Sequence, residues 1–227
     1  MHDSVSSPPS DAPTPARPSW SPYILHDYTF SDFSAGARVL DVGCGQGTHL
    51  KQAAERGCWV AGIELDDDAL AACKRRGLTV VQARAEALPF RSGSLDGVIC
   101  KVVLPYTDEA RALGEFARIL KHHGTACVEY HGLGYYVRYL LLGPDLKFRI
   151  YGLRAIVNSW LYAAIGRRFP GFLGDTIYQS RPRLGRAYRR LGLRVIEDTR
   201  APAFLGLPVF IYQRLRVDYP SLTPGLK

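Results

Sequence analysis

The stretch VLDVGCGQGTHL, residues 39–50, decides the fold that we expect of this chain. A short apolar run leads into a loop, Asp41 to Gly47, that holds three glycines, and residues 48–56 after it have a helical pattern. Between a strand and a helix, glycines let backbone N–H groups approach a ligand closely. We therefore expect a strand, a ligand-binding loop and a helix, which form the first βα unit of an α/β protein.

The rest of the chain continues this alternation of β-branched runs and helical stretches. Strands are expected at residues 38–42, 58–63, 78–82, 95–103, 125–131, 193–198 and 208–216. Helices are expected at residues 48–56, 67–76, 107–121 and 182–192. The pattern predicts a Rossmann-like sheet of seven mostly parallel strands with helices on both faces. The last strand is expected to be antiparallel, in a hairpin at the edge of the sheet.

Composition suggests how the chain is divided. Residues 1–19 are rich in Pro, Ser and Ala and lack the apolar segment of a signal peptide, so we expect a disordered tail. A single domain is expected over residues 20–227, with residues 20–36 as an N-terminal cap. Residues 133–180, which are aromatic and rich in arginine, are expected to form a helical insertion on the substrate side, after the fifth strand.

Apolar runs and cysteines of the sequence indicate the cellular compartment of the protein. No apolar run is long enough to cross a bilayer, so we expect a cytoplasmic protein. The five cysteines have neither CxxC spacing nor a neighbouring histidine cluster. This pattern favours a reducing compartment and predicts no bound metal.

Charge is distributed unevenly along the chain. Residues 1–132 carry 13 Lys and Arg against 16 Asp and Glu, whereas residues 133–227 carry 16 against 5. The net charge of +8 therefore comes from the second part alone. Such a field favours an anionic small molecule, a nucleic acid or an acidic membrane surface as partner. The alternative is that the arginines only keep an apolar insertion in solution.

A second feature supports a ligand site beside the loop. Glu64 follows the second expected strand, 17 residues after Gly47. In an open α/β sheet, ligands bind outside the carboxyl ends of the strands, where such a carboxylate can accept hydrogen bonds from both hydroxyls of a ribose. Glycines also occupy strand-to-helix turns for steric reasons, but the loop and the acid together indicate a nucleoside site.

Three stretches of the sequence carry a resemblance to a known family. VLDVGCGQGTHL resembles motif I of the class I S-adenosylmethionine-dependent methyltransferases, and GIELDDDAL, residues 62–70, resembles their acidic motif after the second strand. The segment from Ala83 to Tyr106 is similar to their third and fourth strands. The resemblance covers about residues 38–131 and is to the ubiquinone and menaquinone subgroup, often called type 11. It implies S-adenosylmethionine as the cofactor.

The same resemblance implies roles for the loop. Asp41 is expected to help position the amino group of the methionine part of the cofactor. Gly43, Cys44 and Gly45 are expected to line the methionine and the ribose. Glu64 is expected to hold the two ribose hydroxyls.

Residues further along the chain are expected at the adenine and sulfonium ends. Leu65 is expected to pack on the adenine. Relatives often have an Asp that reaches the adenine amino group, but this chain has Arg84, which cannot accept a hydrogen bond. The hydrogen bond to the adenine amino group is therefore expected from the Ala85 backbone or from Glu86. Lys101 lies where relatives approach the sulfonium, and it could reach the cofactor carboxylate, an acidic substrate or only the solvent.

Two further residues are candidates for direct roles. Tyr23, in the expected cap, is the preferred cofactor contact of that segment. Methyl transfer requires alignment of two reactants and, for a hydroxyl acceptor, removal of a proton. His131, at the end of the fifth expected strand, is the candidate general base because the ordinary pKa of histidine is close to neutral. The alternative is a histidine with a structural role.

The acceptor is less defined by the sequence. The tetrapeptide of adenine and cytosine amino-methylases and the Pro-Cys nucleophile of cytosine C5 enzymes do not occur. We expect transfer to a small molecule with anionic or amphipathic character, through an oxygen of a lipid-like, quinone-like, glycan or secondary-metabolite acceptor. The alternative is a methyltransferase-fold protein that binds RNA or a membrane, including an RNA methyltransferase.

Overall fold

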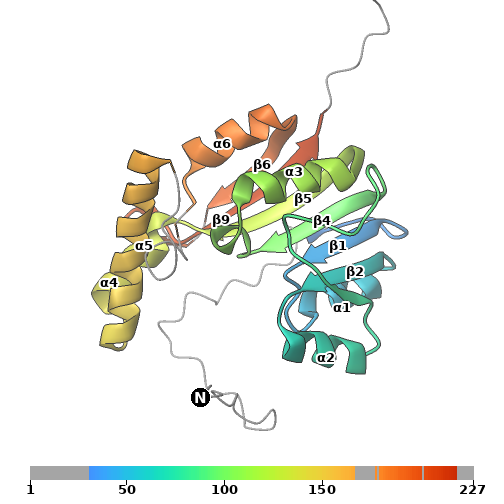
Figure 1. Cartoon of the computed structure of the whole chain (residues 1–227), viewed down its shortest axis with the longest axis horizontal. Helices are drawn as coiled ribbons and strands as arrows, with labels where there is room; N and C mark the ends of the chain where they lie inside the picture. Colours follow the sequence, from blue (N-terminus) through green and yellow to red (C-terminus); the bar gives the residue numbers. More distant parts are fainter. Residues whose placement is uncertain (1–30, 167–176, 178, 201, 219–227) are drawn as a thin grey trace, which may run out of the picture.

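A computed structural model describes residues 31–166, 177, 179–200 and 202–218, and its helices and strands form one α/β sheet structure (Figure 1). The strands of the main sheet are β1 (Arg38–Val42), β2 (Trp59–Glu64), β3 (Val80–Gln82), β4 (Leu95–Lys101), β5 (Leu120–His131), β6 (Leu193–Arg200) and β9 (Phe210–Val217). The helices are α1 (Thr48–Glu55), α2 (Asp67–Arg75), α3 (Glu109–Ile119), α4 (Leu133–Leu142), α5 (Leu146–Ile165) and α6 (Arg181–Arg190). None of these helices is long and apolar enough to span a membrane.

The strand order confirms the predicted fold class. The seven strands lie in the order β3, β2, β1, β4, β5, β9, β6. The pairings from β3 to β5 are parallel, and β9 is antiparallel to both β5 and β6. The predicted antiparallel pair is present at the edge, with the last strand inside and β6 outermost. A small hairpin, β7 (Ala203–Phe204) and β8 (Leu207–Pro208), connects them.

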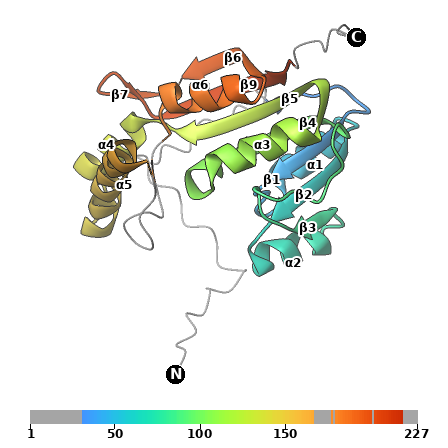
Figure 2. The ribbon, with the colours of Figure 1, turned by 45° about the horizontal axis from the view of Figure 1, so that its top comes forward.

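Neighbouring side chains of β1 show that both faces of the sheet are covered. Val39 belongs to a buried apolar cluster with Ala53 of α1, whereas Leu40 belongs to another with Phe116 of α3 and Tyr188 of α6. Because successive side chains of a strand point to opposite faces, α1 lies on one face and α3 and α6 lie on the other (Figure 2).

The connection from β3 to β4 is a loop that α3 holds in place. The Arg118 guanidinium donates to the carbonyl oxygens of Leu88 at 3.0 Å and Phe90 at 2.8 Å. The Leu88 N–H donates to Glu115 at 2.7 Å. Charged groups make the stronger hydrogen bonds in proteins, so these contacts fix the loop without a crossover helix. Residues 84–86 lie shortly before these contacts in the sequence.

Helices α4 and α5 pack side by side beyond the carboxyl end of β5, at one end of the sheet (Figure 1). A Cβ atom at Gly152 of α5 would lie 2.5 Å from the Tyr136 carbonyl oxygen of α4, so the two backbones approach closely there. A second buried cluster, rich in aromatic side chains, joins this pair to β9 through residues such as Tyr139 and Phe210.

Candidate functional site

A cavity of about 330 Å³ lies where the carboxyl ends of β1, β2 and β4 meet. This is the edge at which open α/β sheets bind their ligands. Seven of the residues predicted to contact the cofactor line the cavity: Gly43, Glu64, Leu65, Arg84, Ala85, Glu86 and Lys101. The sheet thus brings together residues from four separate parts of the sequence.

The glycine loop is tied to the neighbouring strand and pressed against the end of β4. The N–H groups of Gly43 and Cys44 donate to the Ile63 carbonyl oxygen at 2.9 and 3.0 Å. Gly43 has φ of +69°, and a Cβ atom there would lie 2.4 Å from Cγ2 of Val103. Only glycine fits this conformation and this distance without strain. Gly43 also lines the cavity.

Glu64 connects the loop to the end of β2. Its Oε2 accepts a hydrogen bond from the Gly45 N–H at 2.8 Å, and its Oε1 accepts from the N–H groups of Leu65 at 2.7 Å and Asp66 at 3.2 Å. A carboxylate has about four acceptor positions, and these three N–H groups use three of them, so one position on Oε2 remains for a ligand hydroxyl. The carboxylate therefore has a fixed direction before any ligand arrives.

Asp41 has an unsatisfied group beside the cavity. Its side chain is 2% exposed, and its Oδ2 has no hydrogen-bond partner among the described residues. Burial, and then repulsion from Glu64, raises the pKa of Asp41 to about 7, while Lys101 acts in the opposite direction. A buried acceptor without a donor is costly. A protonated amino group, such as that of the methionine part of the cofactor, would supply the missing donor, so these residues fit the predicted cofactor.

Lys101 is held by an acid from the next strand. Its Nζ lies 3.1 Å from Oε2 of Glu129, which is buried on β5 opposite Lys101. Burial raises the pKa of Glu129, and the Lys101 ammonium partly offsets this effect. The positive charge at the cavity wall is therefore balanced within the sheet. This pairing favours a fixed lysine over one that only reaches the solvent.

At the predicted adenine end, Glu86 has a structural contact of its own. Its Oε1 accepts from the Asp108 N–H at 2.9 Å, at the start of α3, and lies 3.5 Å from Nη2 of Arg84. Ala85 is buried and Leu65 is half exposed at the rim. Glu86 thus joins the loop after β3 to α3 and lines the cavity at the same time.

His131 does not line the cavity at the glycine loop, nor the second cavity, between α3, α5 and α6, that is described below. It is 2% exposed, and its ring stacks on Tyr135 with 3.6 Å between ring centroids. Burial lowers the pKa of His131 to about 3, so its ring is neutral at pH 7. Both ring nitrogens lack a hydrogen-bond partner among the described residues. The base role of His131 stays a prediction.

Tyr23 and most of the predicted cap, residues 20–36, lie outside the described residues.

The end of β4 contributes residues that we did not predict. Val102 has φ of +57°, which is unusual for a β-branched residue and turns the chain at the cavity wall. Such strained residues concentrate at functional sites. Tyr106 also lines the cavity, and its hydroxyl lies 3.4 Å from the Tyr151 hydroxyl of α5. Nothing in the sequence near these residues indicates the turn or the contact.

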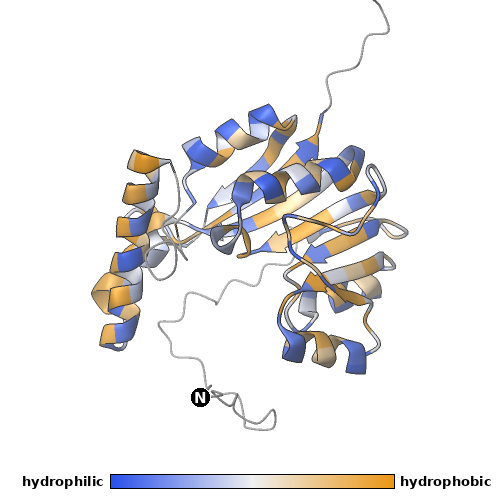
Figure 3. Cartoon of the chain, viewed as in Figure 1, coloured by the Kyte–Doolittle hydropathy of each residue, from blue (hydrophilic) through white to orange (hydrophobic). Residues whose placement is uncertain are grey.

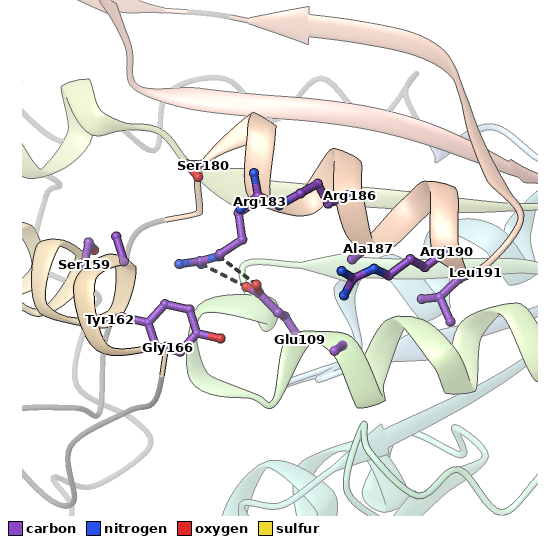
Figure 4. A pocket seen from close by; sticks show the side chains of 12 residues that line it. Glu109, Ser159, Tyr162, Gly166, Ser180, Arg183, Arg186, Ala187, Arg190 and Leu191 are labelled. Atoms are coloured by element: carbon purple, nitrogen blue, oxygen red, sulfur yellow. Dashed lines mark hydrogen bonds and ion pairs between the residues drawn. The ribbon is translucent and has the colours of Figure 1, made fainter.

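A second cavity, of about 450 Å³, lies between α3, α5 and α6 (Figure 4). At its wall, Nε of Arg183 lies 2.7 Å from Oε1 of Glu109, and the Arg183 guanidinium lies over the Tyr162 ring at 4.8 Å. Arg186 and Arg190 also line this cavity, and neither guanidinium makes a hydrogen bond or ion pair with a described residue. The cavity therefore carries positive charge that is not balanced within the described part of the chain.

Comparisons with known proteins agree with the geometry of the first cavity. Residues 40–128 match the sequence pattern of a family described as "Methyltransferase domain". A protein of Haemophilus influenzae described as uncharacterized is 34% identical over 138 residues, which cover 56% of this chain and 52% of that protein. The ubiquinone biosynthesis O-methyltransferase of Methylococcus capsulatus is 36% identical over 99 residues, covering 40% of this chain and 42% of that enzyme. The chain thus spans about half the length of these relatives.

Solved structures show the same fold over most of the chain. The crystal structure of an S-adenosylmethionine-dependent methyltransferase from Mesorhizobium loti superposes with a TM-score of 0.63. It is 18% identical, and the match covers 83% of this chain and 94% of that one. Sequence pattern and fold thus agree over the region that holds the glycine loop and Glu64. Over residues 40–128 the chain is thus similar in sequence to a methyltransferase domain, and over most of its length it is similar in fold to an S-adenosylmethionine-dependent methyltransferase.

Proposed function

We propose that this chain is an enzyme that transfers the methyl group of S-adenosylmethionine to an oxygen of a small-molecule acceptor. The observation that carries the proposal is the pair of acids beside the glycine loop. Asp41 offers a buried acceptor without a donor, and Glu64 offers a carboxylate already fixed by three backbone N–H groups. Together they suit the amino group and the ribose of the cofactor.

The residues of the chain have distinct roles in this proposal. When bound, S-adenosylmethionine supplies a methyl group on a positively charged sulfur. Glu64 holds the ribose hydroxyls, Asp41 holds the amino group, and Leu65, Ala85 and Glu86 enclose the adenine, with Arg84 at the rim.

The remaining groups hold the loop and the cavity wall. Gly43, Cys44 and Gly45 line the cofactor with backbone, and Lys101 is kept in place by Glu129. Catalysis then consists mainly of alignment of the two reactants.

The acceptor in this proposal is anionic or amphipathic, of the lipid-like, quinone-like, glycan or secondary-metabolite classes. The excess of Lys and Arg over Asp and Glu after residue 132 supports anionic character. Arg186 and Arg190 line the second cavity, which begins at Glu109, two residues from the Thr107 that lines the first. The name of the Methylococcus capsulatus relative supports an oxygen acceptor of quinone type.

The division of the chain and its location belong to the same proposal. We assign residues 133–180 to an acceptor-side insertion, residues 20–36 to a cap and residues 1–19 to a tail. We assign the protein to the cytoplasm, and the five free cysteines support this assignment because thiols stay reduced there.

Titration calorimetry with S-adenosylmethionine and S-adenosylhomocysteine tests the cofactor role. Glu64→Ala is expected to weaken binding by at least about 100-fold, because each hydrogen bond to a charged group contributes roughly 1.5 to 3 kcal/mol. Glu55→Ala, which removes an exposed carboxylate on α1, is the matched control and should bind as the parent does. Equal affinities of the two variants would exclude the proposed role of Glu64.

His131 as general base needs a separate test. A neutral histidine with a low pKa accepts a proton poorly, so the role requires that the ring leaves Tyr135 when acceptor binds. His131→Gln is expected to lower the turnover of an identified acceptor without changing cofactor affinity. If turnover is unchanged, the base is another group or the solvent.

RNA binding is the second candidate, favoured by the basic half of the chain. Binding to tRNA that falls steeply with salt would support it, because phosphate contacts release counterions. If the chain binds tRNA in this way and releases no S-adenosylhomocysteine with any small acceptor, the small-molecule proposal fails.

A further inference from the structure

Helix α5 carries a set of large apolar side chains on the outside. Its fully buried residues are all small or polar: Gly152, Ala155, Asn158 and Ser159. By contrast, Leu146 is 71% exposed and Trp160 is 75% exposed. A helix that only covers a core buries its large apolar residues. Phe148, Tyr151 and Ile156 of α5 pack against the buried aromatic cluster in this way, but a second set of large apolar residues on the same helix is exposed. This outer face is therefore not part of the interior of the described chain.

The exposed apolar residues form one line along the helix, which we call the α5 stripe: Leu146, Ile150, Leu153, Val157 and Trp160. Their spacing of four and three residues places them on one face of an α-helix. Just before α5, Leu141 and Leu142 at the end of α4 are exposed as well. Figure 3 shows hydrophobic residues along this pair of helices, at the end of the molecule. Contiguous exposed apolar surface of this kind marks an interaction site.

The charges around the stripe identify what it would contact. Residues 133–165 contain four basic residues and a single acidic one, Asp145. Two of the basic residues, Lys147 and Arg149, are exposed and follow Leu146 on opposite sides of the stripe. Apolar side chains with lysine and arginine along their flanks are typical of helices that lie in the interface of an anionic membrane.

We propose that α5 attaches this protein to the surface of anionic membranes, with the α5 stripe inserted among the lipids. The helix lies along the bilayer and does not cross it. The same helix carries Tyr151, whose hydroxyl lies 3.4 Å from Tyr106 at the wall of the cofactor cavity. Attachment through α5 therefore holds that cavity close to a lipid surface, from which a lipid-like acceptor can be taken. The attachment does not depend on the proposed methyl transfer, since it is measured without an acceptor.

Flotation of the full chain with vesicles tests the proposal. We expect binding to vesicles of phosphatidylcholine with phosphatidylglycerol, and much weaker binding to phosphatidylcholine alone. Leu146→Ser/Trp160→Ser is expected to lower the partition by about 100-fold, because each large apolar side chain contributes roughly 1.5 kcal/mol or more on burial. Lys147→Gln/Arg149→Gln is expected to lower it about fivefold for each charge removed.

Leu205→Ser is the matched control, because Leu205 is 72% exposed and lies outside the stripe. It should float as the parent does. If the parent does not bind the anionic vesicles, or if Leu146→Ser/Trp160→Ser binds them equally, the proposal is overturned. Circular dichroism on all variants shows whether each has the parent fold, since exposed substitutions should change stability little.

Two further measurements separate lipid from protein as the occupant of the stripe. In a Trp20→Phe/Trp59→Phe background, Trp160 is the only tryptophan of the chain. Its emission should shift to the blue with anionic vesicles, and an unchanged spectrum contradicts insertion. Sedimentation velocity without vesicles gives the oligomeric state. A parent dimer that Leu146→Ser/Trp160→Ser dissociates, together with no vesicle binding, would assign the stripe to a second copy and overturn the proposal.

Discussion

The sheet region and the helix pair α4–α5 use apolar residues in opposite ways. In β1, Leu40 and Val42 are fully buried between the helices and the neighbouring strands. In α5, Leu146 and Trp160 face outward although the helix has twenty residues with which to form an inner face. Apolar content alone therefore does not tell whether a segment builds the core. In this chain it builds the core in the first region and an interaction surface in the second.

The two regions also differ in their charges. The cofactor cavity is lined by Glu64, with Asp41 buried next to the lining residue Val42, and its lysine is paired with Glu129. The second cavity is lined by Arg186 and Arg190 without acidic partners among the described residues. This contrast suits an acidic site for the cationic groups of the cofactor beside a basic site for an anionic acceptor.

The largest expected difference between the two regions is in the free energy of unfolding that is lost when a leucine is shortened to alanine. Leu40→Ala should lower the free energy of unfolding by about 2 to 5 kcal/mol, because it leaves a cavity in a closed core. Leu146→Ala should change it by no more than about 0.5 kcal/mol, because that side chain already meets solvent. Urea unfolding measures both. Equal losses would show that α5 is covered by another part of the chain.

Asp41→Asn should have opposite effects on the stability of the chain and on cofactor binding at pH 8. The pKa of Asp41 in the folded chain, about 7, lies above its ordinary value of 3.8. The folded state thus binds this proton more tightly, and the resulting stability is full below about pH 4 and lost as the pH rises through 7. At pH 8 the asparagine variant should be more stable by as much as about 4 kcal/mol, the free energy of that pKa difference.

The same variant should bind S-adenosylmethionine more weakly than the parent at pH 8, because an amide has no charge to attract the ammonium group. Urea unfolding at pH 5 and pH 8, with calorimetry at pH 8, measures both effects. A variant that is less stable than the parent at pH 8 would mean that Asp41 has a donor in the folded chain.

A glycine substitution tests the close packing of α4 against α5. In Gly152→Ala, the new methyl group would lie 2.5 Å from the Tyr136 carbonyl oxygen and 2.8 Å from the Leu140 nitrogen. Overpacking of this kind should cost about 1 to 3 kcal/mol. Gly185→Ala in α6 is the control, since its methyl group would meet only Arg189, at 3.7 Å. It should stabilise the chain by about 0.5 to 1 kcal/mol, and similar results for both variants would contradict the tight helix pair.

The smallest expected effect concerns the contact between the two regions. The hydroxyls of Tyr106 and Tyr151 lie 3.4 Å apart. A double-mutant cycle with Tyr106→Phe and Tyr151→Phe should give a coupling free energy of about 0.5 kcal/mol, the low end for a neutral hydrogen bond. Urea unfolding of the four proteins measures it. Strict additivity would mean that the two regions do not interact through this pair.

The features that could be predicted from the sequence are those encoded by neighbouring residues. The glycine loop and the acid after the second strand each need only a few adjacent residues, because glycine conformation and the end of a strand are local properties. The parallel sheet followed from the alternation of elements. Even so, the sequence predicted the fifth strand only from residue 125, whereas β5 begins at Leu120, where the chain becomes extended and pairs with Leu95 of β4.

Other features required the tertiary structure. The Lys101 and Glu129 pair and the Tyr106 and Tyr151 contact join residues far apart in the chain, and no local pattern indicates them. The sequence by itself determined the fold class and the cofactor loop. Only the packed structure decided that His131 is buried under Tyr135 and that the apolar side of α5 faces outward. The physical reason is that periodicity shows which residues share a face of a helix, whereas the neighbours that cover that face come from elsewhere in the chain.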